Sequence, residues 1–114
     1  CTSMGRVLLA ALPEAEARNL VRGSQRAALT PHTITGEEAL MTEIAKARAQ
    51  GYALIDQEIE LGLRSIAVPL MNSRGRVLAA MNVGVATSRA EPDDMIRHFL
   101  PALEACQAEI RQLL

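Results

Sequence analysis

The chain has few aromatic residues and few cysteines, and both shortages narrow what it can be. Among 114 residues there are one Tyr, one Phe and no Trp, so the stacking platforms that hold single-stranded nucleic acid are lacking. Cys1 and Cys106 lie at opposite ends of the chain, and His32 and His98 are isolated. This spacing fits neither a zinc site nor a disulfide framework, and it indicates a reducing, cytoplasmic environment.

A positive net charge and long apolar runs are also missing. Twelve basic residues are interspersed among thirteen acidic ones, which gives a formal net charge of −1. A DNA-binding domain needs a positive surface to displace counterions. The apolar runs are too short to cross a bilayer, and no signal peptide is visible. We therefore do not expect the chain by itself to bind DNA or to enter a membrane.

The composition that remains is typical of a globular domain. The chain is 49% hydrophobic and 22% charged, and its length suits one domain with one core but not two. Aliphatic and small side chains must fill that core. Because the sequence begins at Cys1, inside a segment expected to be structured, we also expect it to be part of a longer protein.

Apolar periodicity predicts two helices in the first 23 residues. Thr2 or Ser3 can cap the first helix, which has apolar residues on one face. Pro13 ends this helix and can open a second one that runs to about Arg22. Gly23 then provides a C-terminal stop.

A third helix and a change of period follow. Residues 24–35 are expected to form a loop, and Thr35-Gly-Glu-Glu38 predicts a capping box that begins a helix ending at Gly51. Beyond it, residues 52–57, 63–71 and 76–86 show the period of two that is typical of strands.

The turn-forming sequence Asn72-Ser-Arg-Gly75 joins the two longer strands into a predicted hairpin. Pro92 can open a last helix that runs to Leu114 and that Pro101 should kink. The order of elements predicts an α+β fold with an antiparallel sheet. Three strands leave open edges, which either missing N-terminal strands or a neighbouring chain would cover.

One face of the hairpin combines small apolar residues with two polar ones. A loop centred on Ser73 and Arg74 places Ser65 opposite Asn82. Burying these groups without partners costs roughly 1–3 kcal/mol each, and a bound polar ligand would remove that cost. Alternatively, this face of the sheet is exposed to water, or the Ser65 and Asn82 side chains form a hydrogen bond with each other. Periodicity alone leaves these readings open.

Other reactive side chains fit structural roles. Asp56, Glu58 and Glu60 alternate in a turn, where carboxylates are usually solvated rather than paired for acid–base work. Arg64 is expected to pair with a nearby carboxylate, and Cys106 to be a buried structural thiol. No nucleophile–base pair or metal cluster stands out, so we predict no enzyme activity, no catalytic residue, no metal and no cofactor.

Five segments of the chain together resemble a known family. They are TSMGRVLLAALP, PHTIT, GYALIDQEIELGLRSIAVPL, GRVLAAMNVGVATSR and LPALEACQAEI. In this order they resemble the C-terminal effector-binding domain of IclR-family transcriptional regulators, over nearly the whole chain. TSMGR and IELGLRSIAVP further resemble the subgroup that controls aromatic-acid breakdown through the β-ketoadipate pathway, the protocatechuate and 4-hydroxybenzoate regulators.

The resemblance implies a GAF/profilin-like fold, with an antiparallel sheet between helices. Residues 1–114 would form a single, partial effector-binding domain that lacks its first strands. An upstream winged helix-turn-helix domain, absent here, would contact DNA. Family members are homodimers or homotetramers, and the effector domain supplies much of the contact between subunits.

In family members the ligand sits between the sheet and the start of the first helix of this segment. Carried over by position, the implied ligand-binding residues are Thr2, Ser3, Met4, Gly5, Ser65, Asn82 and Gly84. Free amides at the helix start could hold a carboxylate through the helix dipole.

The chain departs from members that bind small keto acids. Those often carry Cys at the position of Ser65, an acid at Ile55, and Ser at Asn82 and Gly84. The residues found here imply a roomier, less polar pocket, which favours an aromatic acid or a longer, β-ketoadipate-like dicarboxylate. The expected function is therefore an effector sensor, and the alternative is an oligomerisation module that binds no ligand.

Overall fold

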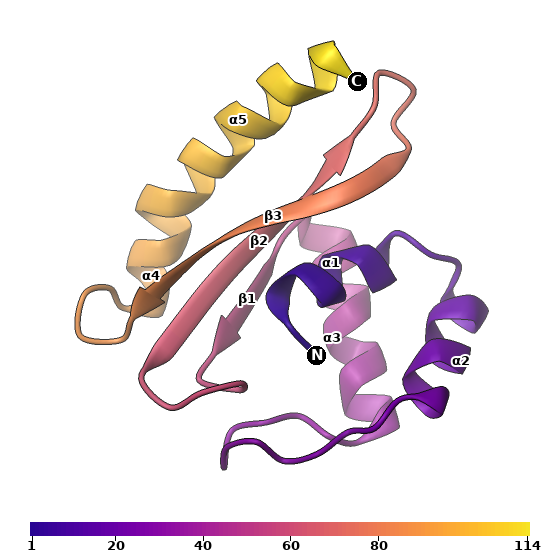
Figure 1. Cartoon of the computed structure of the whole chain (residues 1–114), viewed down its shortest axis with the longest axis vertical. Helices are drawn as coiled ribbons and strands as arrows, with labels where there is room; N and C mark the ends of the chain where they lie inside the picture. Colours follow the sequence, from indigo (N-terminus) through magenta and orange to yellow (C-terminus); the bar gives the residue numbers. More distant parts are fainter.

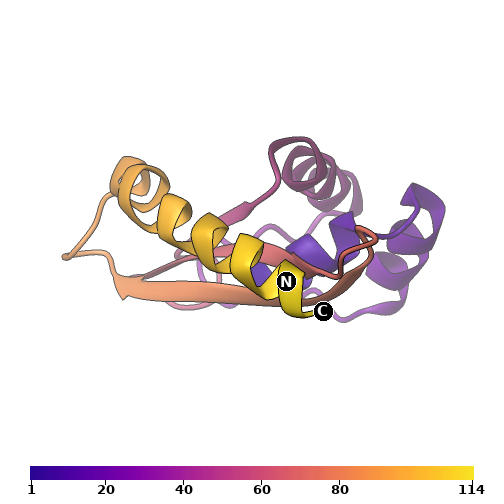
Figure 2. The ribbon, with the colours of Figure 1, turned by 90° about the horizontal axis from the view of Figure 1, so that it is seen from above.

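Two layers of helices enclose one antiparallel sheet in the computed structural model, which describes residues 1–114 (Figures 1 and 2). Helices α1, α2 and α3 lie on one side of the sheet, and the C-terminal helices lie on the other. The elements are α1 (Ser3–Ala10), α2 (Glu14–Gly23), α3 (Glu37–Gln50), β1 (Ala53–Asp56), β2 (Leu63–Met71), β3 (Val77–Ala86), α4 (Pro92–Asp94), the π-helical turn η1 (Met95–Phe99) and α5 (Leu100–Leu113). The predicted α+β fold, with helices on both sides of the sheet, is confirmed.

The sheet has the order β1-β2-β3, so β2 is its central strand. Alternate residues of β2 enter two separate hydrophobic cores, as the period of two requires. Ala67 belongs to the core formed with α1, α2 and α3. Ile66 and Val68 belong to the core formed with Met95 and α5. Both faces of β2 are therefore packed, whereas Asn82 and Gly84 on the neighbouring β3 are exposed, so the face with Ser65 is exposed to water only at its β3 end.

Local signals place the starts and ends of the helices well. Thr2 caps α1, and its Oγ1 accepts a hydrogen bond from the Gly5 amide at 3.0 Å. Gly51 ends α3 in the left-handed conformation, with φ of 84°. The predicted capping box at Thr35 is wrong, because α3 has Gly36 at its N-cap and no side-chain cap bond. Glu38 instead pairs with Arg18 of α2, since a guanidinium group attracts the carboxylate more strongly than a backbone amide does.

The register of the hairpin differs by two residues from the prediction. Ser65 lies opposite Gly84, and Asn82 lies opposite Ala67. Asn72 accounts for part of the difference, because its Oδ1 accepts hydrogen bonds from two backbone amides of the turn, both at 3.0 Å. A bulge next to Leu70 adds the rest. A shift of two residues preserves the face, so the polar residues still lie on the side of α1.

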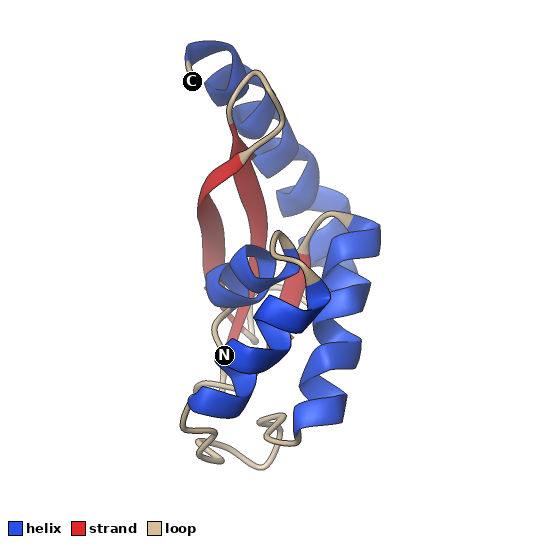
Figure 3. Cartoon of the chain, turned by 90° about the vertical axis from the view of Figure 1, so that its right-hand side faces the viewer, coloured by secondary structure: helices blue, strands red, loops and turns tan.

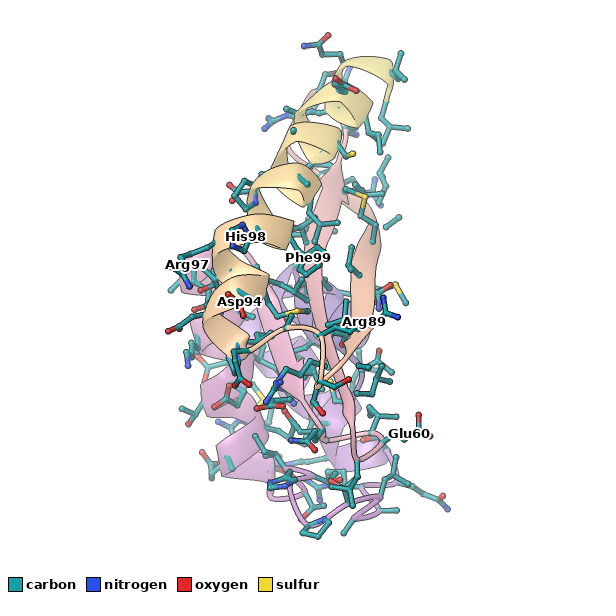
Figure 4. The ribbon with its side chains drawn as sticks, turned by 90° about the vertical axis from the view of Figure 1, so that its left-hand side faces the viewer. Glu60, Arg89, Asp94, Arg97, His98 and Phe99 are labelled. Atoms are coloured by element: carbon teal, nitrogen blue, oxygen red, sulfur yellow. The ribbon has the colours of Figure 1, made fainter.

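The last helix contains a π-helical turn just before Pro101. The Leu100 amide bonds to the Met95 carbonyl, five residues earlier, as a π turn requires. The extra residue shifts the phase of α5. Leu100 therefore takes the buried position five residues after Met95, with Phe99 packed beside it against the same core (Figure 4). Cys106 turns outward and is exposed. The prediction of a buried Cys106 thiol is wrong for this reason.

No helix of the chain has both the length and the hydropathy needed to cross a membrane. Likewise, no group of three or more His, Cys, Asp or Glu side chains lies close enough together to hold a metal ion.

Candidate functional site

The first turn of α1 lies against the centre of the sheet, and one hydrogen bond joins the two (Figure 3). Ser65 Oγ of β2 donates to Ser3 Oγ of α1 at 2.9 Å. Ser3 is only 1% exposed. The partner of Ser65 is therefore Ser3 rather than Asn82, which corrects the side-by-side pair expected from the hairpin register.

A row of three positions crosses the sheet beneath this turn. Ser65 faces Ile55 on β1 and Gly84 on β3. Ile55 is 2% exposed, so the β1 end of the row is closed and apolar. Gly84 is exposed, and so is Asn82, two residues earlier on the same face of β3. The row therefore opens to solvent at the edge of β3, and the Asn82 side chain makes no hydrogen bond within the chain.

The start of α1 offers backbone donors to this region. Thr2 engages the Gly5 amide through its hydroxyl and the Arg6 amide through its carbonyl, at 2.9 Å. The amides of Ser3 and Met4 have no intrahelical acceptor, as is usual for a first turn. These two amides are the donors that a carboxylate could use, fewer than the sequence suggested.

A buried ion pair holds this part of α1 in place. Arg6, 2% exposed, donates through Nη2 to Glu58 Oε1 at 3.0 Å and through Nη1 to Oε2 at 3.2 Å. Glu58 is 8% exposed, so its predicted solvated role is wrong. The sequence did carry a signal, because Arg6 shares the apolar stripe of α1 with Val7 and Ala10, where a charge needs a partner.

Two further hydrogen bonds join the loop before α3 to the loop after β1. Thr30 Oγ1 donates to the Gln57 carbonyl at 2.6 Å, and Thr33 Oγ1 donates to the Glu58 carbonyl. Gln57 has a positive φ of 61°, and its Oε1 accepts from the Gly62 amide at 3.1 Å. The two loops therefore form one hydrogen-bonded surface beside the first turns of α1.

On the other face of β2, Arg64 forms the ion pair that the sequence predicted. Its Nε lies 2.8 Å from Asp56 Oδ1. Its Nη1 also donates to the carbonyls of Thr87 and Ala90, at 3.1 and 2.7 Å. Arg64 thus connects the central strand to the segment that leads into α4.

Comparison with known proteins identifies the family. The model described as bacterial transcriptional regulator IclR C-terminal matches residues 1–112. The chain belongs to the IclR family. Its relatives are transcriptional regulators and not enzymes, in agreement with the expectation from the sequence.

Two regulators of aromatic-acid metabolism are among the relatives of this IclR-family chain. The Pca regulon regulatory protein of Pseudomonas putida is 42% identical over 110 residues, which cover 96% of this chain and 38% of the relative. The p-hydroxybenzoate hydroxylase transcriptional activator of Acinetobacter baylyi is 36% identical over 113 residues, covering 99% and 42%. The resemblance to the β-ketoadipate subgroup is confirmed. The chain spans about two fifths of the length of these relatives.

A solved structure gives the same assignment. It is a double mutant of the inducer-binding domain of the transcription factor PobR from Acinetobacter, in complex with 3-hydroxybenzoic acid. The TM-score is 0.95 at 35% identity, and the match covers 99% of this chain and 65% of that chain.

The structure gathers the seven residues implied by the IclR resemblance around one corner. Among them, Thr2 bonds to Gly5 within the first turn of α1, and Ser3 bonds to Ser65 across to the sheet. Met4 is 37% exposed, and Asn82 and Gly84 are exposed on β3. Of the seven, only Gly5 borders a cavity of the chain. The corner between α1 and β3 is an open surface rather than an enclosed pocket.

Proposed function

We propose that the chain is the effector-sensing part of a bacterial transcriptional regulator. The effector is a small organic acid, either an aromatic acid or a β-ketoadipate-like dicarboxylate. It lies over Ser65, Asn82 and Gly84 and meets the start of α1 at residues 2–5. The observation that carries this proposal is the 2.9 Å bond between Ser3 and Ser65, which brings helix start and sheet centre together beside an unpaired Asn82.

The polar groups at this corner suit an acid. The Ser3–Ser65 hydrogen bond uses one of the two hydroxyl protons, so the pair keeps one proton that can be donated to a ligand oxygen. The free amides of Ser3 and Met4 suit a carboxylate, because the positive end of the helix dipole lies there. Asn82 can both donate to and accept from a ring hydroxyl or a keto group. The chain only binds the ligand and breaks none of its bonds.

Sensing requires that the ligand bind two arrangements of the protein with different affinity. The α1 helix couples binding to the rest of the molecule, because Arg6 follows directly after the proposed ligand residues and is fixed to Glu58. We infer that a winged helix-turn-helix domain upstream of residues 1–114 reads this change on DNA, in the cytoplasm. The aromatic-acid regulators among the relatives support the ligand class.

A thermal-shift screen with protocatechuate, 4-hydroxybenzoate and β-ketoadipate tests the proposal. At a ligand concentration 100 times Kd, the true effector should stabilise the fold by about 2.7 kcal/mol. Asn82→Leu should abolish the shift, because it removes the exposed amide. Asn19→Leu, the same substitution at an exposed position of α2, should keep it. A folded protein that none of the three acids stabilises contradicts the proposal.

The open edge of β3 favours the second candidate, an oligomerisation module without ligand. This ten-residue strand pairs with β2 on one side only, and an unpaired edge invites another strand. We propose that the protein forms homodimers or homotetramers in either case. Analytical ultracentrifugation of the wild type and of Asn82→Leu, each with and without the acids, separates the candidates. A pure oligomerisation module keeps the same oligomeric state when acid is added, in the wild type and in the variant.

A further inference from the structure

A partly open cavity borders α1 outside the sheet-facing corner, which is the open surface between α1 and β3. This cavity of about 530 Å³ lies between α1, α2, α3 and residues 24–34. Its volume falls within the range of small-molecule sites, about 300–1,000 Å³. The walls are mainly aliphatic, with polar residues at 24–26 and 33, and contain no aromatic ring. The aliphatic residues include Leu9, Leu20, Leu29, Ile34, Leu40 and Ile44.

The cavity has a buried floor and an exposed apolar rim. Leu40 and Ile44 of α3 are 3% and 0% exposed. Leu20 and Leu29, on α2 and in the following loop, are 54% and 60% exposed. Covering such side chains is favourable by about 25 cal/mol per Å² of apolar surface. An aliphatic body placed in the cavity would therefore gain from both floor and rim.

One unpaired positive charge borders this cavity. Arg26 is exposed and forms no ion pair in the chain. The neighbouring Arg18 and Arg22 form ion pairs with Glu37. The acidic residues at the start of α3 are therefore already paired and do not neutralise Arg26. Gln25 also lines the cavity. An anionic head group is the complement that this end of the cavity lacks.

The cavity is preformed, because hydrogen bonds fix the loop that closes it. Thr30 and Thr33 both donate to the backbone of the loop after β1. Thr33 and Ile34 are lining residues in the same segment. Figure 1 shows this segment passing from α2 to the start of α3 below the N-terminus. Binding of a ligand would therefore not lose free energy to ordering of this loop.

We propose that this cavity is a second ligand site, for an aliphatic monocarboxylate, with the chain between the helices and the carboxylate at Arg26. The site is separate from the sheet-facing corner, and the two share only Gly5. A ligand in the cavity would act on the same first turn of α1 that meets the proposed effector. The proposal does not depend on the identity of that effector.

Isothermal titration calorimetry with octanoate, octanol and octylammonium tests the charge and the class of ligand. Octanoate should bind, and octylammonium should bind about tenfold more weakly, because one attracts and the other repels an exposed guanidinium group. Arg26→Gln should weaken octanoate about fivefold and leave octanol unchanged. The matched control is Arg89→Gln, since Arg89 is an exposed arginine without an ion pair on the α4 side of the molecule (Figure 4).

A second pair of variants locates the binding. Leu29→Asp places a negative charge at the exposed rim and should abolish octanoate binding, with an unchanged circular-dichroism spectrum. Asn82→Leu should leave octanoate binding unaffected. Loss of octanoate binding in Asn82→Leu would instead assign the acid to the sheet-facing corner. Equal binding of the three probes, no binding of octanoate to the folded protein, or self-association that octanoate reverses would each overturn the proposal, the last by assigning the cavity to a second copy of the chain.

Discussion

At the scale of single residues, the ion pair of Arg6 and Glu58 is the most deeply buried pair of charges in the protein. Both charges are removed from water, and two parallel hydrogen bonds compensate them. The remaining donor, Arg6 Nε, is buried without a partner. A pair of this kind contributes little beyond a well-packed apolar substitute, but losing one member leaves the other charge buried alone.

Glu58→Gln should therefore destabilise the protein strongly. We expect the free energy of unfolding to fall by about 3 kcal/mol, because the Arg6 guanidinium loses its counterion in a buried site. Urea denaturation followed by circular dichroism measures the change. Glu60→Gln is the control: Glu60 is exposed two residues away, and its loss should cost less than about 0.5 kcal/mol. Equal effects of the two substitutions would show that the Glu58 pair is no more important than a surface charge.

At the scale of elements, the α2–α3 contact depends on exposed charges and hence on pH. Hydrogen bonds from Arg22, at 2.6 Å, and from Arg18 lower the pKa of Glu37, although partial burial opposes them. A carboxyl group with a lower pKa in the folded state stabilises the fold above its unfolded-state pKa. That contribution is lost as the pH falls through the folded-state pKa.

Glu37→Gln should therefore lower the stability of the protein at pH 7, and the difference from wild type should vanish in acid, below the pKa of Glu37. Thermal denaturation across this pH range measures the effect. Glu16→Gln, which removes an exposed acid of α2 without an ion pair, should show no such pH dependence. If the difference in stability between Glu37→Gln and the wild type stayed constant with pH, the proposed role of the Glu37 charge would be wrong.

The turn of the hairpin depends on one glycine. Gly75 has φ of 81°, and a Cβ there would meet only Arg111 Nη2, at an ordinary 3.6 Å. The cost of Gly75→Ala therefore comes from the backbone and should be about 1–2 kcal/mol. Gly23→Ala, at the end of α2 where nothing lies within 4 Å, should instead be neutral or stabilising. Chemical denaturation of the two variants compares them directly, and similar effects would refute the argument.

The elements that the sequence predicted correctly are those specified by nearby residues. Thr2, Pro13, Gly51 and Pro92 mark helix ends through interactions within a few positions, so the order of helices and strands could be read in advance. Faces of strands could also be predicted, because a shift of two residues leaves them unchanged. The register itself could not, since it depends on the bulge at Leu70. The sequence predicted a disruption of the last helix at Pro101, but not that it would take the form of a π-helical turn that exposes Cys106.

The candidate site was harder to predict because its contacts are long-range. Ser3 and Ser65 are 62 positions apart, and Arg6 and Glu58 are 52 apart. Pattern alone showed that Ser65 lies on a small, partly polar face, and only the resemblance to the IclR family connected it with the start of α1. The cavity beside Arg26 left no periodic trace, because its walls come from three helices and a loop.

At the scale of the whole molecule, the fold is one narrow sheet with a core on each face. The molecule extends 39 × 37 × 18 Å, and the strands follow one another along the shortest dimension (Figure 2). Because β2 contributes to both cores, neither core can lose its packing without exposing the central strand. The two cores should therefore unfold together.

This shared strand predicts a single unfolding transition. Ile44→Ala in one core and Met95→Ala in the other should each lower stability by about 2–5 kcal/mol, since both residues are fully buried. In every variant, the midpoints from far-ultraviolet circular dichroism and from Tyr52 fluorescence should coincide. Leu113→Ala, at a position that is 85% exposed, should change little. Two separate transitions in either core variant would show that the cores are independent.

The alternation of side chains along β2 also has a mechanical consequence. Ser65 contacts Ser3 at the start of α1, while its neighbour Arg64 binds the carbonyls of Thr87 and Ala90 just before α4. These two neighbours share one planar peptide bond, which hardly deforms. A ligand that changes the Ser3–Ser65 contact therefore acts one residue away from the attachment of β2 to the segment before α4. At residues 64 and 65 the central strand joins the helical layers on its two faces.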